Sequence, residues 1–248
     1  MFGFLKQRRR QRLRAQSFPP AWQSIVTRNL PIFRRLPPED QTELLGHVQV
    51  FLAEKHLEGC GGLELTDEIR VTIAAQACLL LLHRDTDYYP QLITILVYPS
   101  SFTAYEARHL GGNIWEEGGQ ERLGHTARRL GAMVLAWDSA KRGAADPSDG
   151  RNLVLHEFAH QLDFEDLAWS RVMSKGFEAL RAADEAGMAT VLDTYGAKDP
   201  AEFFAVVTEA FVERPRALRA KHSELYAELA RFFRQDPTRY SAEPATTA

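Results

Sequence analysis

The chain has 248 residues, of which 45% are hydrophobic and 25% are charged, and its formal net charge is -3. This composition is typical of a globular protein with one enzyme-sized domain, and the charge offers no general attraction to nucleic acid. Two cysteines are too few for a disulfide framework, so we expect free thiols and a cytoplasmic location. The apolar stretches fall far short of the ~20 residues that a membrane-spanning helix needs.

The two ends of the chain differ in composition from its body. Residues 6–14 hold six cations within nine positions. Such a run can contact anionic lipid, nucleic acid or an acidic protein, but without interleaved aromatic residues it is more typical of a solvated arm. We therefore expect a basic N-terminal arm at 1–18, with no direct nucleic-acid binding and no stable membrane insertion. A single domain is expected over 19–240, with a helical N-terminal part at about 19–90, and then a disordered tail at 241–248.

Helical and extended patterns alternate along the body of the chain. Apolar residues recur at helical spacing over 38–55. A second, more apolar helix is predicted over 66–82, with Thr66 as its N-cap. Residues 92–98 and 131–137 have the short, apolar character of strands, and a polar run after the second strand predicts a connecting loop. Four further helices are predicted, at about 150–164, 169–186, 200–213 and 216–234.

The segment NLVLHEFAHQLD, residues 152–163, contains the H-E-x-x-H pattern, and Asp149 is placed to cap its helix. His156 and His160 lie one helical turn apart on nearly one face, so both imidazoles can bind one zinc ion. Glu157 stands beside them, where its carboxylate can deprotonate a zinc-bound water and then pass the proton to the leaving amine. A chance match is expected only about 0.02 times per random chain of this composition. The pattern therefore predicts a catalytic site with one Zn²⁺ per chain.

A catalytic zinc needs a third protein ligand, and no histidine follows at the spacing of the extended H-E-x-x-H-x-x-G-x-x-H pattern. Glu202 and Glu209 share a face of a later predicted helix, because they are seven residues apart. Glu202 also fits a capping box that begins at Asp199. These residues alone leave Glu202 and Glu209 as equal candidates for the third ligand. The glutamate that does not bind the metal would accept a hydrogen bond from a ligating imidazole. Asp163, one turn beyond His160, is a further candidate for orienting the His160 imidazole. The alternative for Asp163 is an exposed residue near the end of the helix.

The segment HEFAHQLD, followed by Tyr195 and DPAEFFAVVTEAF, resembles the Mlc titration factor A family of zinc peptidases, which is similar to the catalytic domain of anthrax lethal factor. The resemblance covers most of the chain, including LELTDEIRVTIAAQA and ITILVYP, although only the histidine helix and the DPAE element are functionally specific. It implies that Glu202 is the third ligand and that Glu209 has a supporting role. It also places the Tyr195 hydroxyl towards the metal, where it can stabilise an oxyanion. The alternative for Tyr195 is packing at a loop-to-helix junction.

We expect an α+β, zincin-like metallopeptidase domain with a small mixed sheet, an active-site helix and a helical C-terminal half. The strand at 131–137 is either an edge strand that binds an extended peptide or an ordinary internal strand. The resemblance implies aminopeptidase-like hydrolysis of peptides and binding to a transcriptional repressor of sugar uptake. One interpretation is thus a zinc peptidase of the gluzincin type, and the other is a regulatory protein that sequesters the repressor, with catalysis secondary. A purely structural zinc site is disfavoured because Glu157 would then have no role.

Overall fold

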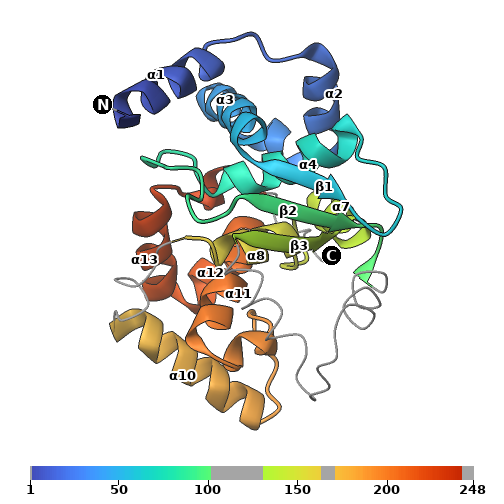
Figure 1. Ribbon diagram of the computed structural model, residues 1–248. Coiled ribbons are helices and arrows are strands. Elements are labelled where there is room, and N and C mark those ends of the chain that lie inside the picture. Colours follow the sequence, from blue (N-terminus) through green and yellow to red (C-terminus); the bar gives the residue numbers. More distant parts are fainter. Residues whose placement is uncertain (1, 102–130, 163–170, 242–248) are drawn as a thin grey trace.

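Figure 1 shows a computed structural model of the chain, which describes residues 2–101, 131–162 and 171–241. A three-stranded sheet lies between the N-terminal helices and the helices of the C-terminal half (Figure 1). Its strands, in spatial order, are β1 (His56–Gly59), β2 (Thr94–Tyr98) and β3 (Ala132–Ala136). Both pairings are parallel, so the expectation of a mixed sheet is wrong for the described residues. Helix α4 (Asp67–Leu79) returns the chain between β1 and β2, and a helical crossover of this kind produces parallel strands.

The sheet confirms two of the predicted strands and adds one that the sequence did not indicate. Ile95 and Val97 of β2 are fully buried, and Met133 and Leu135 of β3 continue the same alternation. Strand β1 was not predicted because its four residues, HLEG, include a single buried apolar side chain. It forms a strand because its backbone pairs with β2 over four residues.

Helices α3 (Pro38–Glu54) and α4 pack against each other beside the sheet. Thr66 caps α4 as predicted, and its hydroxyl accepts a hydrogen bond from the Ile69 amide at 3.4 Å. Every residue from Ile69 to Leu79 except Arg70 is buried, which agrees with the apolar character of this segment. The helix ends three residues before the predicted Leu82.

Two further differences from the sequence predictions concern α7 (Trp137–Ala145) and the last predicted helix. Helix α7 occupies most of the polar run that was expected to be a connecting loop, and the helix predicted over 216–234 is two helices separated at His222. No helix in the described ranges is long and apolar enough to cross a membrane. Further α-helices are α2 (Pro20–Asn29), α10 (Arg171–Glu185), α12 (Pro215–Lys221) and α13 (Ser223–Phe233). Three short 3-10 helices are η1 (Pro31–Arg35), η2 (Thr194–Ala197) and η3 (Pro237–Arg239).

The cationic N-terminal run forms helix α1 (Phe2–Arg14), which packs against α3. Arg10 is 7% exposed, and its guanidinium binds both carboxylate oxygens of Glu54 at 2.8 and 2.7 Å. A third hydrogen bond of 2.6 Å joins it to Asp87. The run is therefore not the wholly solvated arm that we expected, because Arg10 meets two carboxylates that only the folded chain brings together. The tail predicted at 241–248 lies outside the described residues, apart from Ser241.

Replacing Arg10 by alanine removes a nearly buried cation and leaves Glu54 without its main partner. We expect Arg10→Ala to lower the free energy of unfolding by about 2–4 kcal/mol, because a partner of a buried ion pair is lost. The exposed Arg12 on the same helix is the control, and Arg12→Ala should change this energy by less than about 0.5 kcal/mol. Urea denaturation measures both. Equal losses in the two variants would contradict the buried ion pair.

Candidate metal centre

Helix α8 (Leu153–Ala159) carries His156 and Glu157, and His160 follows directly at its C-terminal end. The side chain of Asn152 caps the helix by accepting a hydrogen bond from the Leu155 amide at 3.0 Å. The prediction that Asp149 is the cap is therefore wrong. Its carboxylate instead accepts a hydrogen bond from the amide of Arg151, in the loop before the helix. The helix consequently starts at residue 153, three residues later than predicted.

One face of α8 is anchored in the core, which turns the histidines towards the opposite face. The ring of Phe158 lies 5.6 Å from that of Phe51 on α3 and 4.8 Å from that of Tyr89, measured between centroids. Val154 and Leu155 are fully buried as well. The side chains left on the other face are the polar ones of the H-E-x-x-H pattern.

Helix α11 (Pro200–Glu213) packs against α8 and brings three carboxylates to it. Asp199 caps α11 as predicted, since its side chain accepts hydrogen bonds from the amides of Ala201 and Glu202 at 2.8 and 2.9 Å. The Glu202 carboxylate turns towards α8. Because Glu202, Glu209 and Glu213 are spaced by seven and four residues, they lie along one side of the helix.

Three ligand atoms from these two helices meet at one point. Glu202 Oε2 lies 2.9 Å from His156 Nε2 and 3.5 Å from His160 Nε2. The edges of a tetrahedron of zinc ligands are about 3.3–3.4 Å, given metal–ligand distances of about 2.0–2.1 Å. The spacing of the three donors, all within 4.8 Å of one another, thus fits a single metal ion. Their side chains are only 2–17% exposed.

Glu209 contacts the other nitrogen of the same imidazole. Its Oε1 lies 2.8 Å from His156 Nδ1, and its Oε2 accepts a hydrogen bond from the backbone amide of Asn152. The residues alone did not distinguish the two glutamates, but their positions differ: Glu202 faces the point shared with His160, and Glu209 lies behind His156.

The electrostatics of the cluster favour positive charge at this point. Burial opposes the imidazolium of His156, but hydrogen bonds with Glu202 and Glu209 outweigh burial and raise its pKa to about 10. Burial would also raise the pKa of Glu202, yet the contacts with His156 and His160 hold it well below its usual range. The same carboxylates that stabilise a protonated imidazole here would stabilise a metal cation between the three donors.

Asn152 and Glu213 belong to the same cluster and were missed in the sequence analysis. Asn152 Nδ2 donates a hydrogen bond of 3.0 Å to Glu213 Oε1, and burial raises the pKa of Glu213 to about 9. Helix α7 approaches the start of α8 closely, since a Cβ added to Gly143 of α7 would lie 3.0 Å from the Asn152 Cα. A sequence signal existed, namely a third acidic residue on the face of an otherwise apolar helix.

Glu157 and Tyr195 flank the three donors. Glu157 is half-buried and makes no hydrogen bond or ion pair within the described part of the chain. Tyr195, on η2, is 41% exposed, and its ring centroid lies 5.9 Å from that of His156. Burial and the negative charges of Glu202 and Glu157 raise the pKa of Tyr195, while Lys198, whose Nζ lies 3.8 Å from the ring centroid, opposes this shift.

The prediction for Asp163 falls outside the described residues. His160 Nδ1, on the imidazole that Asp163 was a candidate to orient, is buried and has no hydrogen-bond partner among the residues that the structure does describe.

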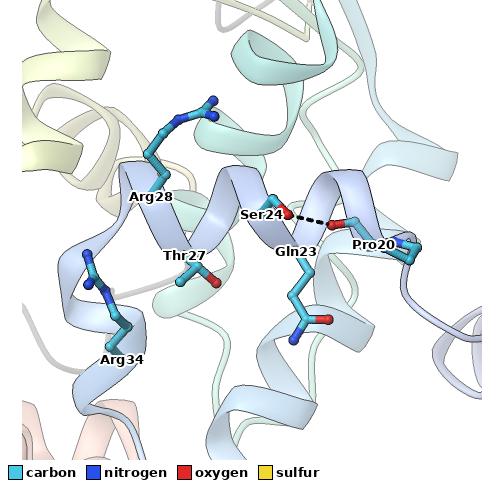
Figure 2. Close-up of a pocket in the computed structure, with 6 residues that line it drawn as sticks. All are labelled: Pro20, Gln23, Ser24, Thr27, Arg28 and Arg34. Atoms are coloured by element: carbon cyan, nitrogen blue, oxygen red, sulfur yellow. Dashed lines mark hydrogen bonds between the residues drawn. The ribbon is translucent and has the colours of Figure 1, made fainter.

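A surface hollow of about 540 Å³ lies elsewhere, along α2 and η1. Figure 2 shows the side chains that line it: Pro20, Gln23, Ser24, Thr27, Arg28 and Arg34. None of them is a histidine or a carboxylate, so this hollow contributes nothing to the candidate metal centre.

An α+β fold that brings two imidazoles and a carboxylate together is compatible with a metallopeptidase domain. Residues 4–168 and 165–234 match the family described as glucose-regulated metallo-peptidase M90. The chain belongs to this family, which implies a metal cofactor.

Relatives support the same assignment. The chain is 37% identical over 244 residues to the uncharacterized protein slr2042 of Synechocystis sp., covering 92% of this chain and 89% of the relative. It is 30% identical over 243 residues to Mlc titration factor A of Pectobacterium atrosepticum, covering 87% and 86%. For Mlc titration factor A of Edwardsiella ictaluri the identity is 29% over 225 residues, covering 84% and 85%. The resemblance to the Mlc titration factor A family is thus confirmed.

Substituting Asn152 tests how the site is held together. Asn152→Ala removes the helix cap, worth about 1 kcal/mol, and leaves the buried Glu213 without its partner, which costs about 1–3 kcal/mol. We expect a loss of about 2–4 kcal/mol in the free energy of unfolding by urea denaturation. Asp149→Ala is the control and should lose no more than about 1 kcal/mol, because it removes one exposed hydrogen bond and no cap. A larger loss of stability in Asp149→Ala than in Asn152→Ala would indicate that Asp149 is the cap.

Proposed function

We propose that this chain is a zinc-dependent, aminopeptidase-like peptidase of the gluzincin type. The observation that carries the proposal is the meeting of His156 Nε2, His160 Nε2 and Glu202 Oε2 at one point between α8 and α11. Membership of a metallopeptidase family supports it.

The donor set fits zinc. His156, His160 and Glu202 would hold the ion, and two imidazoles with one carboxylate are a ligand set of catalytic rather than structural zinc sites. Bound zinc would act as a Lewis acid at the substrate carbonyl and lower the pKa of water. Glu209, which contacts Nδ1 of His156, would keep Nε2 unprotonated and pointed towards the ion.

The residues around the donors supply the other parts of peptide hydrolysis. Glu157, whose carboxylate has no partner in the described ranges, would accept a proton from the attacking water and deliver it to the amine of the leaving group. The partly exposed hydroxyl of Tyr195 would donate a hydrogen bond to the oxyanion that forms at the carbonyl. Strand β3, the last strand of the sheet within the described residues, lies beside α8 and would align an extended peptide with the site.

A Glu157→Gln variant tests the chemistry. We expect kcat for peptide cleavage to fall by a factor of about 10²–10⁴, because the amide cannot accept the proton. Zinc content should not change, because Glu157 is not a ligand. The assay compares digestion of a peptide library with and without a chelator, followed by zinc restoration. Glu178→Gln on the exposed face of α10 is the control. Full activity in Glu157→Gln, or cleavage that resists the chelator, would refute the proposed mechanism.

A Glu209→Gln variant tests the distinction between the two glutamates. Loss of a carboxylate behind a ligating imidazole typically weakens metal binding by about 10–100-fold, and we expect that range here. Glu202→Gln should weaken binding more, because it removes a ligand. Competition with a chromophoric zinc chelator measures both affinities, with Glu224→Gln as a surface control. A larger effect of Glu209→Gln would exchange the two roles.

A second candidate function is the binding of a transcriptional repressor. It rests on the relatives named Mlc titration factor A, and on the repressor of sugar uptake that this resemblance implies as a partner. The Glu157→Gln variant separates the two functions: repressor binding that persists without cleavage indicates an enzyme with a separable interaction. Full biological activity of the variant would make catalysis secondary. A cytoplasmic location remains a prediction, consistent with the free thiols of Cys60 and Cys78.

A further inference from the structure

A second group of ligating side chains lies on elements that supply no ligand to the candidate metal centre. Asp40 and Glu43 come from the first turns of α3, three residues apart and so on one face. His83 follows α4 and lies between them, with Nε2 at 3.1 Å from Asp40 Oδ1 and Nδ1 at 3.7 Å from Glu43 Oε2. One ligand atom from each of the three residues lies within 4.8 Å of the others.

Asp40 is the residue whose burial needs an explanation. It is only 7% exposed, and taking a carboxylate out of water is costly unless a cation accompanies it. Among the described residues no lysine or arginine forms an ion pair with Asp40 or Glu43, and the ion-pair partners present are histidines. An imidazole carries charge only when it is protonated. The group therefore holds two carboxylates without a permanent positive charge beside them.

Glu43 is held in position by groups that are not needed as ligands. The backbone amide of His83 donates a hydrogen bond of 3.0 Å to Glu43 Oε1. His47 Nε2 lies 3.2 Å from the same oxygen, and His47 Nδ1 lies 2.7 Å from the hydroxyl of Tyr88. In the tautomer that satisfies both contacts, Tyr88 donates to Nδ1 and Nε2–H donates to Glu43. This arrangement leaves Glu43 Oε2 directed towards His83.

We propose that Asp40, Glu43 and one ring nitrogen of His83 bind a divalent cation of the borderline class, such as Zn²⁺, Co²⁺ or Ni²⁺, at a site separate from the candidate metal centre. An imidazole among the donors favours these ions over Mg²⁺ and Ca²⁺, which take oxygen ligands. The His83 side chain is 39% exposed, so it has room to rotate onto the ion, and water completes the coordination. The site does not depend on the proposed peptidase function.

The number of zinc ions bound per chain tests this site. The metal-free protein is titrated with Zn²⁺ in competition with a chromophoric chelator. We expect two equivalents for the wild type, one for His83→Ala, one for Asp40→Asn and one for His156→Ala. The double variant His83→Ala/His156→Ala should bind none. His56→Ala is the matched control and should keep two, because His56 contacts a single carboxylate, Glu58, at 3.9 Å.

Folding and binding are separated by a second measurement. Circular dichroism first establishes that each variant is folded. Zn²⁺ should then raise the melting temperature of His156→Ala, in which only the proposed site remains, and should leave that of the double variant unchanged. Two equivalents in folded His83→Ala, or no zinc bound by folded His156→Ala, would overturn the proposed site. One equivalent of zinc in His156→Ala would support the proposed site, because the zinc ion lost relative to the wild type is then the one bound at the candidate metal centre.

Discussion

The carboxylate of Glu209 is the contact on which the site depends. One of its oxygens lies against His156 Nδ1, and the other accepts a hydrogen bond from the backbone amide of Asn152. A single side chain of α11 therefore fixes both the start of α8 and the ring of its first histidine. With α8 held in this register, Glu202, two turns earlier on α11, reaches Nε2 of both histidines. Displacing α8 by one turn would separate these atoms.

The contact between α11 and α8 requires carboxyl groups of α11 to be buried, which is electrostatically unfavourable. From Phe203 to Glu213 every residue is buried, and two of them are glutamates that face α8. Each carboxylate is compensated differently: Glu209 binds an imidazole and an amide, whereas burial raises the pKa of Glu213 to about 9, so it is largely protonated at neutral pH. Glu202, at the solvent end of the row, faces Nε2 of both histidines, and these contacts hold its pKa well below the usual range.

Helix α3 links this site to the rest of the molecule. Its Phe51 packs on Phe158 of α8, and its last residue, Glu54, binds Arg10 of α1. Its first turns carry Asp40 and Glu43, so one helix supports the core beneath the candidate metal centre and also supplies carboxylates of the second proposed cation site. The N-terminal half is thus a scaffold with ligating groups of its own.

The sequence by itself determined the features that lie within one element. The H-E-x-x-H spacing, the Asp199 and Thr66 caps, the strands β2 and β3 and the shared face of Glu202 and Glu209 all follow from local periodicity and capping chemistry. The motifs also indicated the family, which the comparison confirmed.

Tertiary structure alone decided which groups meet. It placed Glu202 in front of His156 and Glu209 behind it, made Asn152 rather than Asp149 the cap of α8, paired β1 in a parallel sheet and buried Arg10 against Glu54. The physical reason is that periodicity reports the direction of a side chain around its own axis, whereas the packing of separate elements sets the distance between side chains on them.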